Sequence, residues 1–159
     1  MFIRGALAAA ALMIACPAAA AGIGDNVADI QFTTVFGKDM KLGDLRGEVV
    51  VLTYWMTDCK VCEDQLDVLD HYYRQRRGLG LRVMAISPEL LSGRQIRNEF
   101  EKRMIHPLAS VRGDLGPRNG VPTTYIIDRY GKLQYAAAGG LGLEELNRIL
   151  VPLLKQPQP

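Results

Sequence analysis

Short apolar runs rich in β-branched residues alternate with stretches of helical period along the chain after residue 28. This alternation predicts an α/β domain. Two of the runs, at residues 49–54 and 81–86, are apolar enough to form central strands that are buried on both faces. The predicted strands are residues 30–33, 49–54, 81–86, 124–127 and 133–137.

Three helices are predicted between and after these strands. The first begins near Cys62 and ends before the glycines at 78 and 80. The second opens at Ser92, which has capping-box spacing to Gln95, and its apolar face extends to Met104. The third follows Gly142, with two glutamates in its first turn that favour the helix dipole.

The segment DRYG at residues 128–131 lies between the last two predicted strands. Such a segment is typical of a hairpin turn, so these two strands should be antiparallel neighbours. The sheet as a whole is therefore expected to be mixed.

The first 21 residues differ from the rest, because Arg4 precedes an uncharged, alanine-rich stretch that ends in small residues. This pattern is typical of a secretory signal peptide that is cleaved after Ala20 or Ala21. We expect residues 22–159 to form a single domain that works in the periplasm or an equivalent space outside the cytoplasm.

Two alternatives to cleavage remain for residues 1–21. The segment could stay as an anchor, although a membrane span needs about 20 strongly apolar residues and this stretch is short and mostly alanine. Residues 13–16 (MIAC) loosely resemble a bacterial lipobox, which would place a lipid on Cys16. Contact with a membrane is expected only in these two cases.

The net charge of the chain does not predict a charged partner. The net charge of +2 falls to +1 when Arg4 is removed, which is too small to predict nucleic acid or an anionic membrane as a partner. Recognition should therefore depend on local features, and we expect a monomer.

The candidate chemistry lies in a cysteine pair. Removal of the signal peptide takes Cys16 with it and leaves Cys59 and Cys62, spaced Cys-x-x-Cys between a buried strand and a helix. A cysteine at a helix N-terminus faces unpaired backbone N–H groups, which can lower its thiol pKa to about 3.5–7.5. We predict Cys59 as the nucleophile and Cys62 as the thiol that resolves a mixed disulfide. No cofactor is implied, because the pair itself carries two electrons.

Other uses of the cysteine pair fit the sequence less well. Zinc needs four ligands, and His71 and His106 do not have the spacing of a metal site, so we interpret both as ordinary surface or loop residues and expect no metal. A peroxidatic cysteine is disfavoured because its family pattern has a Thr three residues earlier, where this chain has Met56.

Three separate segments resemble the TlpA/ResA-like branch of the thioredoxin superfamily, which includes cytochrome c maturation reductases. They are residues 37–50 (GKDMKLGDLRGEVV), Trp55 with the cysteine pair, and residues 120–128 (GVPTTYIID). The resemblance covers residues 28–153. It implies a thioredoxin-like fold, with a central mixed sheet flanked by helices, and thiol–disulfide exchange with protein clients and with a membrane or periplasmic redox partner. Whether such a protein reduces or oxidises its clients depends on their relative reduction potentials.

The resemblance also implies roles for individual residues. Pro122 should be a cis-proline facing the cysteine pair. Because proline lacks an N–H, the backbone of Val121, with Thr123 beside it, would bind an extended client segment. The alternative is that Pro122 merely begins an edge strand. Trp55 is expected both to pack in the core and to shield the disulfide from water.

The chain departs from the family pattern around the cysteines. Asp58 replaces a common aromatic residue, and Lys60 lies in the dipeptide between the cysteines. Gln65 stands where relatives often carry a Glu, and Thr53 stands where thioredoxins proper keep a buried Asp, so both usual proton acceptors are missing. We expect Asp58, Lys60 and Gln65 to tune the pair.

Two rival functions come from other classes. A copper-binding assembly protein of the SCO type shares the fold, but it uses Cys-x-x-x-Cys with a distant histidine. The second rival is a binding module whose disulfide is permanent and structural.

Overall fold

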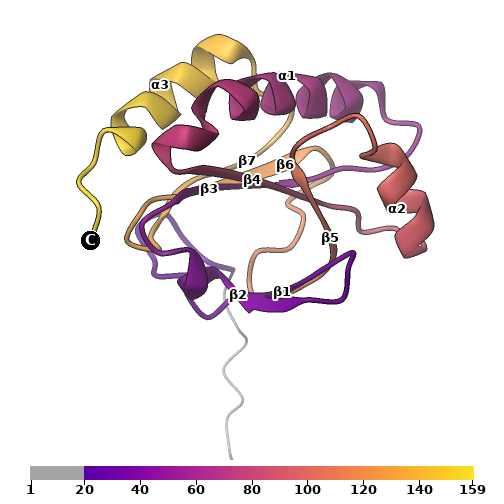
Figure 1. The fold of residues 1–159 in the computed structure, drawn as a ribbon, viewed down its shortest axis with the longest axis horizontal. Helices are drawn as coiled ribbons and strands as arrows, with labels where there is room; N and C mark the ends of the chain where they lie inside the picture. The colour runs from indigo at the N-terminus through magenta and orange to yellow at the C-terminus, as the bar shows by residue number, and fades with distance from the viewer. Residues whose placement is uncertain (1–19) are drawn as a thin grey trace, which may run out of the picture.

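Seven strands form one mixed sheet in the computed structural model, which describes residues 20–159 (Figure 1). The strand order is β2-β1-β5-β4-β3-β6-β7. β3 pairs in parallel with β4 and antiparallel with β6, and β6 pairs antiparallel with β7. The strands are β1 (Gln31–Thr34), β2 (Asp39–Lys41), β3 (Val49–Tyr54), β4 (Leu81–Ile86), β5 (His106–Arg112), β6 (Thr123–Ile127) and β7 (Leu133–Ala138).

Three α-helices and two short 3-10 helices complete the fold of residues 20–159. In Figure 1, α1 and α3 lie next to each other on one face of the sheet, and β1 and β2, which form one edge of the sheet, are drawn at the bottom of the view. The helices are α1 (Lys60–Arg76), α2 (Gly93–Glu99), α3 (Leu143–Leu154), η1 (Leu42–Leu45) and η2 (Arg77–Leu79). In residues 20–159, no helix is both long and apolar enough to cross a membrane. The predicted signal segment, with Arg4 and Cys16, falls before the described residues.

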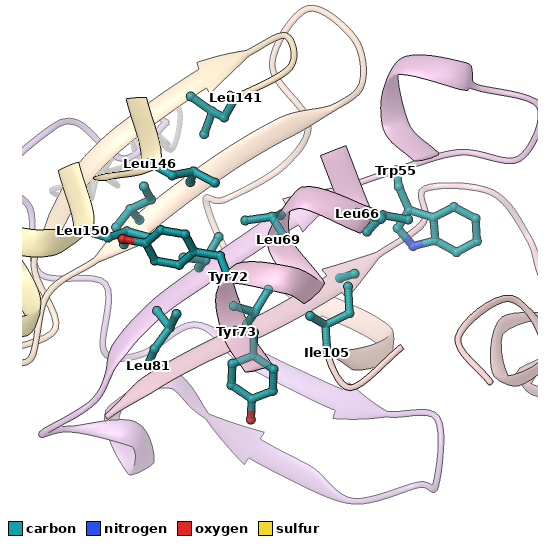
Figure 2. Packing of buried hydrophobic residues seen from close by; sticks show 14 of the residues in the cluster. Trp55, Leu66, Leu69, Tyr72, Tyr73, Leu81, Ile105, Leu141, Leu146 and Leu150 are labelled. Atoms are coloured by element: carbon teal, nitrogen blue, oxygen red, sulfur yellow. The ribbon is translucent and has the colours of Figure 1, made fainter. Parts of the chain in front are cut away.

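β3 is the centre of the core because both faces of the sheet are covered there. All six of its residues are buried. Side chains alternate along a strand, so Val49 and Val51 pack in one apolar cluster while Val50 and Leu52 pack in a second cluster on the opposite face. Figure 2 shows the first cluster, in which Leu69 of α1 and Leu146 of α3 meet above the strands. This confirms the prediction that the run at 49–54 is a central strand.

The hairpin prediction is also confirmed. Asp128 accepts hydrogen bonds from the backbone N–H groups of Tyr130 and Lys132, at 2.9 and 3.0 Å, and so shapes the turn between β6 and β7. The two strands pair antiparallel, with Thr124 opposite Ala137.

The sequence prediction missed two strands and extended one helix too far. β2 has only three residues, and β5 contains a proline and shows no clear alternation, so neither gives a strong pattern. α2 ends at Glu99 rather than reaching Met104. The reason is tertiary: the carboxylate of Asp70 on α1 accepts hydrogen bonds from the backbone N–H groups of Met104 and Ile105, which draws this segment out of the helix.

His106 is a further correction, because it is not an ordinary surface or loop residue. It is half-buried at the start of β5, where its Nε2 lies 2.9 Å from the Tyr73 hydroxyl and 3.0 Å from Nη1 of Arg82. Arginine can only donate, so Nε2 is an acceptor. Burial, followed by the charge of Arg82, lowers the pKa of His106. His71, in contrast, is exposed as predicted.

Candidate active site

The cysteine pair lies where β3 leaves the sheet and α1 begins. β3 ends at Tyr54, and four residues later Cys59 is the N-cap of α1. Cys59 has extended backbone angles, and its Sγ accepts a hydrogen bond of 3.3 Å from the backbone N–H of Cys62. The sulfur therefore occupies the position in which a capping side chain satisfies an unpaired donor at the positive end of the helix. The predicted placement of Cys59 at a helix N-terminus is confirmed.

Cys59 and Cys62 form a disulfide, with their Cα atoms 5.2 Å apart. The two sulfurs differ in access, because Cys62 is 1% exposed and packs in the core, whereas Cys59 is partly exposed. An incoming thiolate or disulfide can thus reach Cys59 first. This arrangement fits the predicted division into an attacking and a resolving thiol.

A surface groove of about 590 Å³ leads to Cys59. Its apolar side includes Trp55 and Met56, and its acidic side includes Glu63 and Glu99. The Trp55 ring is only 2% exposed and packs edge to face on Phe100, with ring centroids 5.3 Å apart. Trp55 therefore belongs to the core, as predicted, and also lines the groove; its shielding of the disulfide from water stays a prediction.

Pro122 reaches the same edge of the sheet. The Val121–Pro122 bond is cis. Antiparallel pairing sets Thr123, the first residue of β6, opposite Tyr54, the last residue of β3, so Pro122 lies next to the start of the cysteine loop. Among residues 20–159, the backbone of Val121 makes no hydrogen bond that would block a client strand.

Thr123 holds the loop that precedes Pro122. Its side chain is fully buried; its Oγ accepts a bond from the N–H of Arg118 and donates a 2.6 Å bond to the carbonyl of Gly120. The hydroxyl thus shapes the loop before Pro122 and does not face the groove.

Gln65 lies on the same side of α1 as Cys62, three residues further along the helix, and is 2% exposed. Its Oε1 accepts a hydrogen bond from the backbone N–H of Leu141, in the loop between β7 and α3. Its Nε2 is buried and has no hydrogen-bond partner within the described part of the chain. The sequence predicts for Gln65 only the lack of a proton acceptor, but the side chain also holds the loop at Leu141 against α1.

The two charged residues next to Cys59 differ in their partners within residues 20–159: Lys60 makes an ion pair and Asp58 does not. Lys60 makes an ion pair with Asp64 one turn along α1, and this hydrogen bond raises the pKa of Lys60. Asp58, immediately before Cys59, is exposed and makes no ion pair with another residue of the range 20–159. Thr53, in β3, is buried, and its hydroxyl makes a 3.1 Å hydrogen bond with the hydroxyl of Thr124 in β6.

Comparison with known proteins supports this description. The model of the AhpC/TSA family matches residues 23–136. The thiol-disulfide oxidoreductase ResA of Geobacillus kaustophilus is 27% identical over 140 residues, which cover 82% of this chain and 78% of that protein. ResA of Bacillus anthracis is 26% identical over 137 residues, covering 80% and 76%.

Solved structures show the same fold. A thiol:disulfide interchange protein of the thioredoxin family from Chlorobium tepidum superposes with a TM-score of 0.70 at 17% identity, covering 85% of this chain and 99% of that one. A secreted thiol-disulfide isomerase from Corynebacterium glutamicum gives 0.69 at 18% identity, covering 80% and 84%. With its Cys59–Cys62 disulfide at the start of α1, the chain is a thiol–disulfide oxidoreductase, and it belongs to the AhpC/TSA family.

Proposed function

We propose that this protein exchanges its Cys59–Cys62 disulfide with the thiols of protein clients outside the cytoplasm, after export directed by residues 1–21. The observation that carries the proposal is the difference between the two sulfurs. Cys59 is accessible at a helix N-terminus and Cys62 is buried behind it, which is the arrangement needed for attack followed by resolution.

The reaction balances without a cofactor. In the oxidising direction, a client thiolate attacks Cys59, the Cys59–Cys62 bond breaks, and Cys62 leaves as a thiolate that takes up a proton. A second client thiolate then attacks the mixed disulfide, so the client gains a disulfide and Cys59 leaves as a thiolate. In the reducing direction the same steps run backwards.

Protein clients rather than small thiols are favoured by the edge formed by Val121. Its backbone groups make no hydrogen bond within residues 20–159, and they lie just before the start of β6, which pairs with the end of β3 that runs into the cysteine loop. An extended segment could add to this edge by backbone hydrogen bonds while its cysteine reaches Cys59.

Client trapping tests the proposal. A Cys62→Ser variant can form a mixed disulfide on Cys59 but cannot resolve it, so clients should be recovered covalently bound from an extract of the exported fraction. A Cys59→Ser variant is the matched control and should trap none. An apocytochrome c among the clients would assign the protein to cytochrome c maturation, whereas a broad client set would assign it to general redox homeostasis. No client on Cys62→Ser would overturn the proposal.

The two rivals have their own tests. A reduction potential below about −300 mV would indicate a permanent structural disulfide. A copper titration of the reduced protein that gave a stoichiometric complex would favour the copper-binding class. In residues 20–159, no three His, Cys, Asp or Glu side chains are grouped to hold a metal ion.

A further inference from the structure

The segment that carries Cys59 leaves the sheet at a defined point. The backbone N–H of Trp55 donates to the carbonyl of Ile86 at 3.0 Å, which continues the parallel pairing of β3 with β4 for one residue. In a parallel ladder the next N–H that points the same way belongs to the residue two positions on, which is Thr57. No backbone carbonyl of residues 20–159 accepts from Thr57.

The carboxylate of Glu89 takes the place of that carbonyl. Its Oε2 accepts the backbone N–H of Thr57 at 2.7 Å, and its Oε1 accepts the Thr57 hydroxyl at 2.7 Å. Two bonds from one carboxylate to one residue fix both the position and the orientation of the Thr57 peptide. Glu89 therefore connects the loop after β4 to the loop after β3.

Glu89 is itself held in place by its own loop. The Ser87 hydroxyl lies 3.2 Å from Oε2 of Glu89, and the backbone N–H of Glu89 donates to the Ser87 Oγ at 3.1 Å. Pro88 between them restricts the backbone further. The hydrogen bonds from Thr57 lower the pKa of Glu89, so the carboxylate is ionised at neutral pH.

The residue between this contact and the cysteine has an unusual backbone. Asp58 has a φ of +52°, in the left-handed region that non-glycine residues seldom adopt. This turn directs the chain from the sheet into α1, so that Cys59 can act as its N-cap. Fixing Thr57 on one side and α1 on the other leaves the chain little freedom to relax at Asp58.

We propose that Glu89 is a positioning residue for Cys59: by holding Thr57, it fixes the geometry in which the Cys59 sulfur caps α1. The proposal rests on the proposed exchange function, since it concerns the reactivity of the same sulfur. Glu89 acts through Thr57 and touches no reacting atom.

The test separates the effect of the hydrogen bonds between Glu89 and Thr57 from the effect of the negative charge of Glu89. Glu89→Asp and Thr57→Val both keep a negative charge at residue 89. Glu89→Asp shortens the side chain that makes both bonds, and Thr57→Val removes the hydroxyl and leaves only the backbone bond. In the reduced proteins, the rate of Cys59 alkylation by iodoacetamide is measured from pH 4 to 9. We expect both variants to raise the apparent pKa of Cys59, because the sulfur is held less firmly at the helix N-terminus, and to slow its attack on a disulfide roughly three- to tenfold.

Two further variants complete the design. Thr57→Ser restores the hydroxyl and should return the pH profile toward that of the wild type. Glu101→Gln is the charge control: it removes an exposed carboxylate that makes no side-chain hydrogen bond within residues 20–159, and its profile should match the wild type. Urea unfolding of each variant shows whether it is folded; if Glu89→Asp does not fold, Thr57→Val still decides.

The alkylation experiment and the client-trapping experiment can fail independently of each other. If the wild type traps clients but Glu89→Asp and Thr57→Val leave the Cys59 profile unchanged, Glu89 only fastens a loop and the positioning role is wrong. If the variants shift the profile while Cys62→Ser traps no client, the positioning role stands and the proposed function fails.

Discussion

The side-chain oxygen of Gln65 accepts a hydrogen bond from the backbone N–H of Leu141, and this fixes which way the amide points. The Nε2 group is consequently turned away from Leu141, buried and without a partner in the described residues. A buried donor without an acceptor is costly, so Gln65 stabilises the fold less than a side chain with all its polar groups paired would.

Gln65→Glu should speed the release of a mixed disulfide. One oxygen of the introduced carboxyl can keep the bond to Leu141, while the other can accept the proton that Cys62 must lose before it attacks. We expect release to quicken by roughly tenfold near neutral pH, which is a modest effect for a positioned base. The first attack by Cys59 should change little. Stopped-flow measurement of attack and release separates the two steps.

Gln65→Leu is the control for this prediction. It removes the bond to Leu141 without supplying a proton acceptor, so release should not quicken. If Gln65→Glu leaves release unaltered, water or Asp58 takes the proton from Cys62, and the missing acid does not limit the cycle.

The two thiols of the reduced protein should differ in reactivity. Cys59 is partly exposed at the N-cap, whereas Cys62 is 1% exposed within the core. We expect alkylation at about pH 7 to label Cys59 at least roughly tenfold faster, since both access and thiolate fraction favour it. Mass spectrometry of peptides at timed intervals measures the two rates, and equal rates would contradict the assigned roles.

Asp58→Asn should lower the pKa of Cys59. The substitution removes an exposed negative charge directly beside the sulfur, and asparagine tolerates the left-handed backbone at this position. We expect a decrease of about half a pKa unit, because water and salt screen most of the interaction between exposed charges. The reduced form is then stabilised, so the protein becomes a stronger oxidant.

Lys60→Gln is the companion variant. Lys60 is paired with Asp64, which removes much of its effect on the sulfur, so the pKa of Cys59 should rise by less than Asp58→Asn lowers it. A titration of thiolate absorbance measures both shifts. A larger effect of Lys60→Gln would mean that the ion pair does not hold in solution.

The features that the sequence predicted well depend on local patterns. The sequence predicts Cys59 at a helix N-terminus because a buried strand, a short loop and a helical stripe follow one another within about twenty residues. The same locality explains the hairpin around Asp128. Three contacts that the sequence did not predict join distant segments: Glu89 and Thr57 are 32 residues apart, Gln65 and Leu141 are 76 apart, and His106 and Tyr73 are 33 apart. No periodic pattern relates such pairs, because they meet only when the sheet brings their loops together.

His106 should make the protein less stable as the pH falls below about 6.5. Its pKa is lowered in the folded protein by burial and then by the charge of Arg82, whereas an unfolded histidine titrates near 6.5. Below that pH the unfolded chain binds a proton that the folded chain resists, so the free energy of unfolding falls as the pH falls toward the folded pKa. His106→Gln removes the titrating ring and should flatten this part of the profile. His71→Gln, on the exposed side of α1, should keep the slope of the wild type. Urea unfolding at pH 7, 6 and 5 measures all three proteins, and an unchanged slope in His106→Gln would place the source of the pH dependence elsewhere.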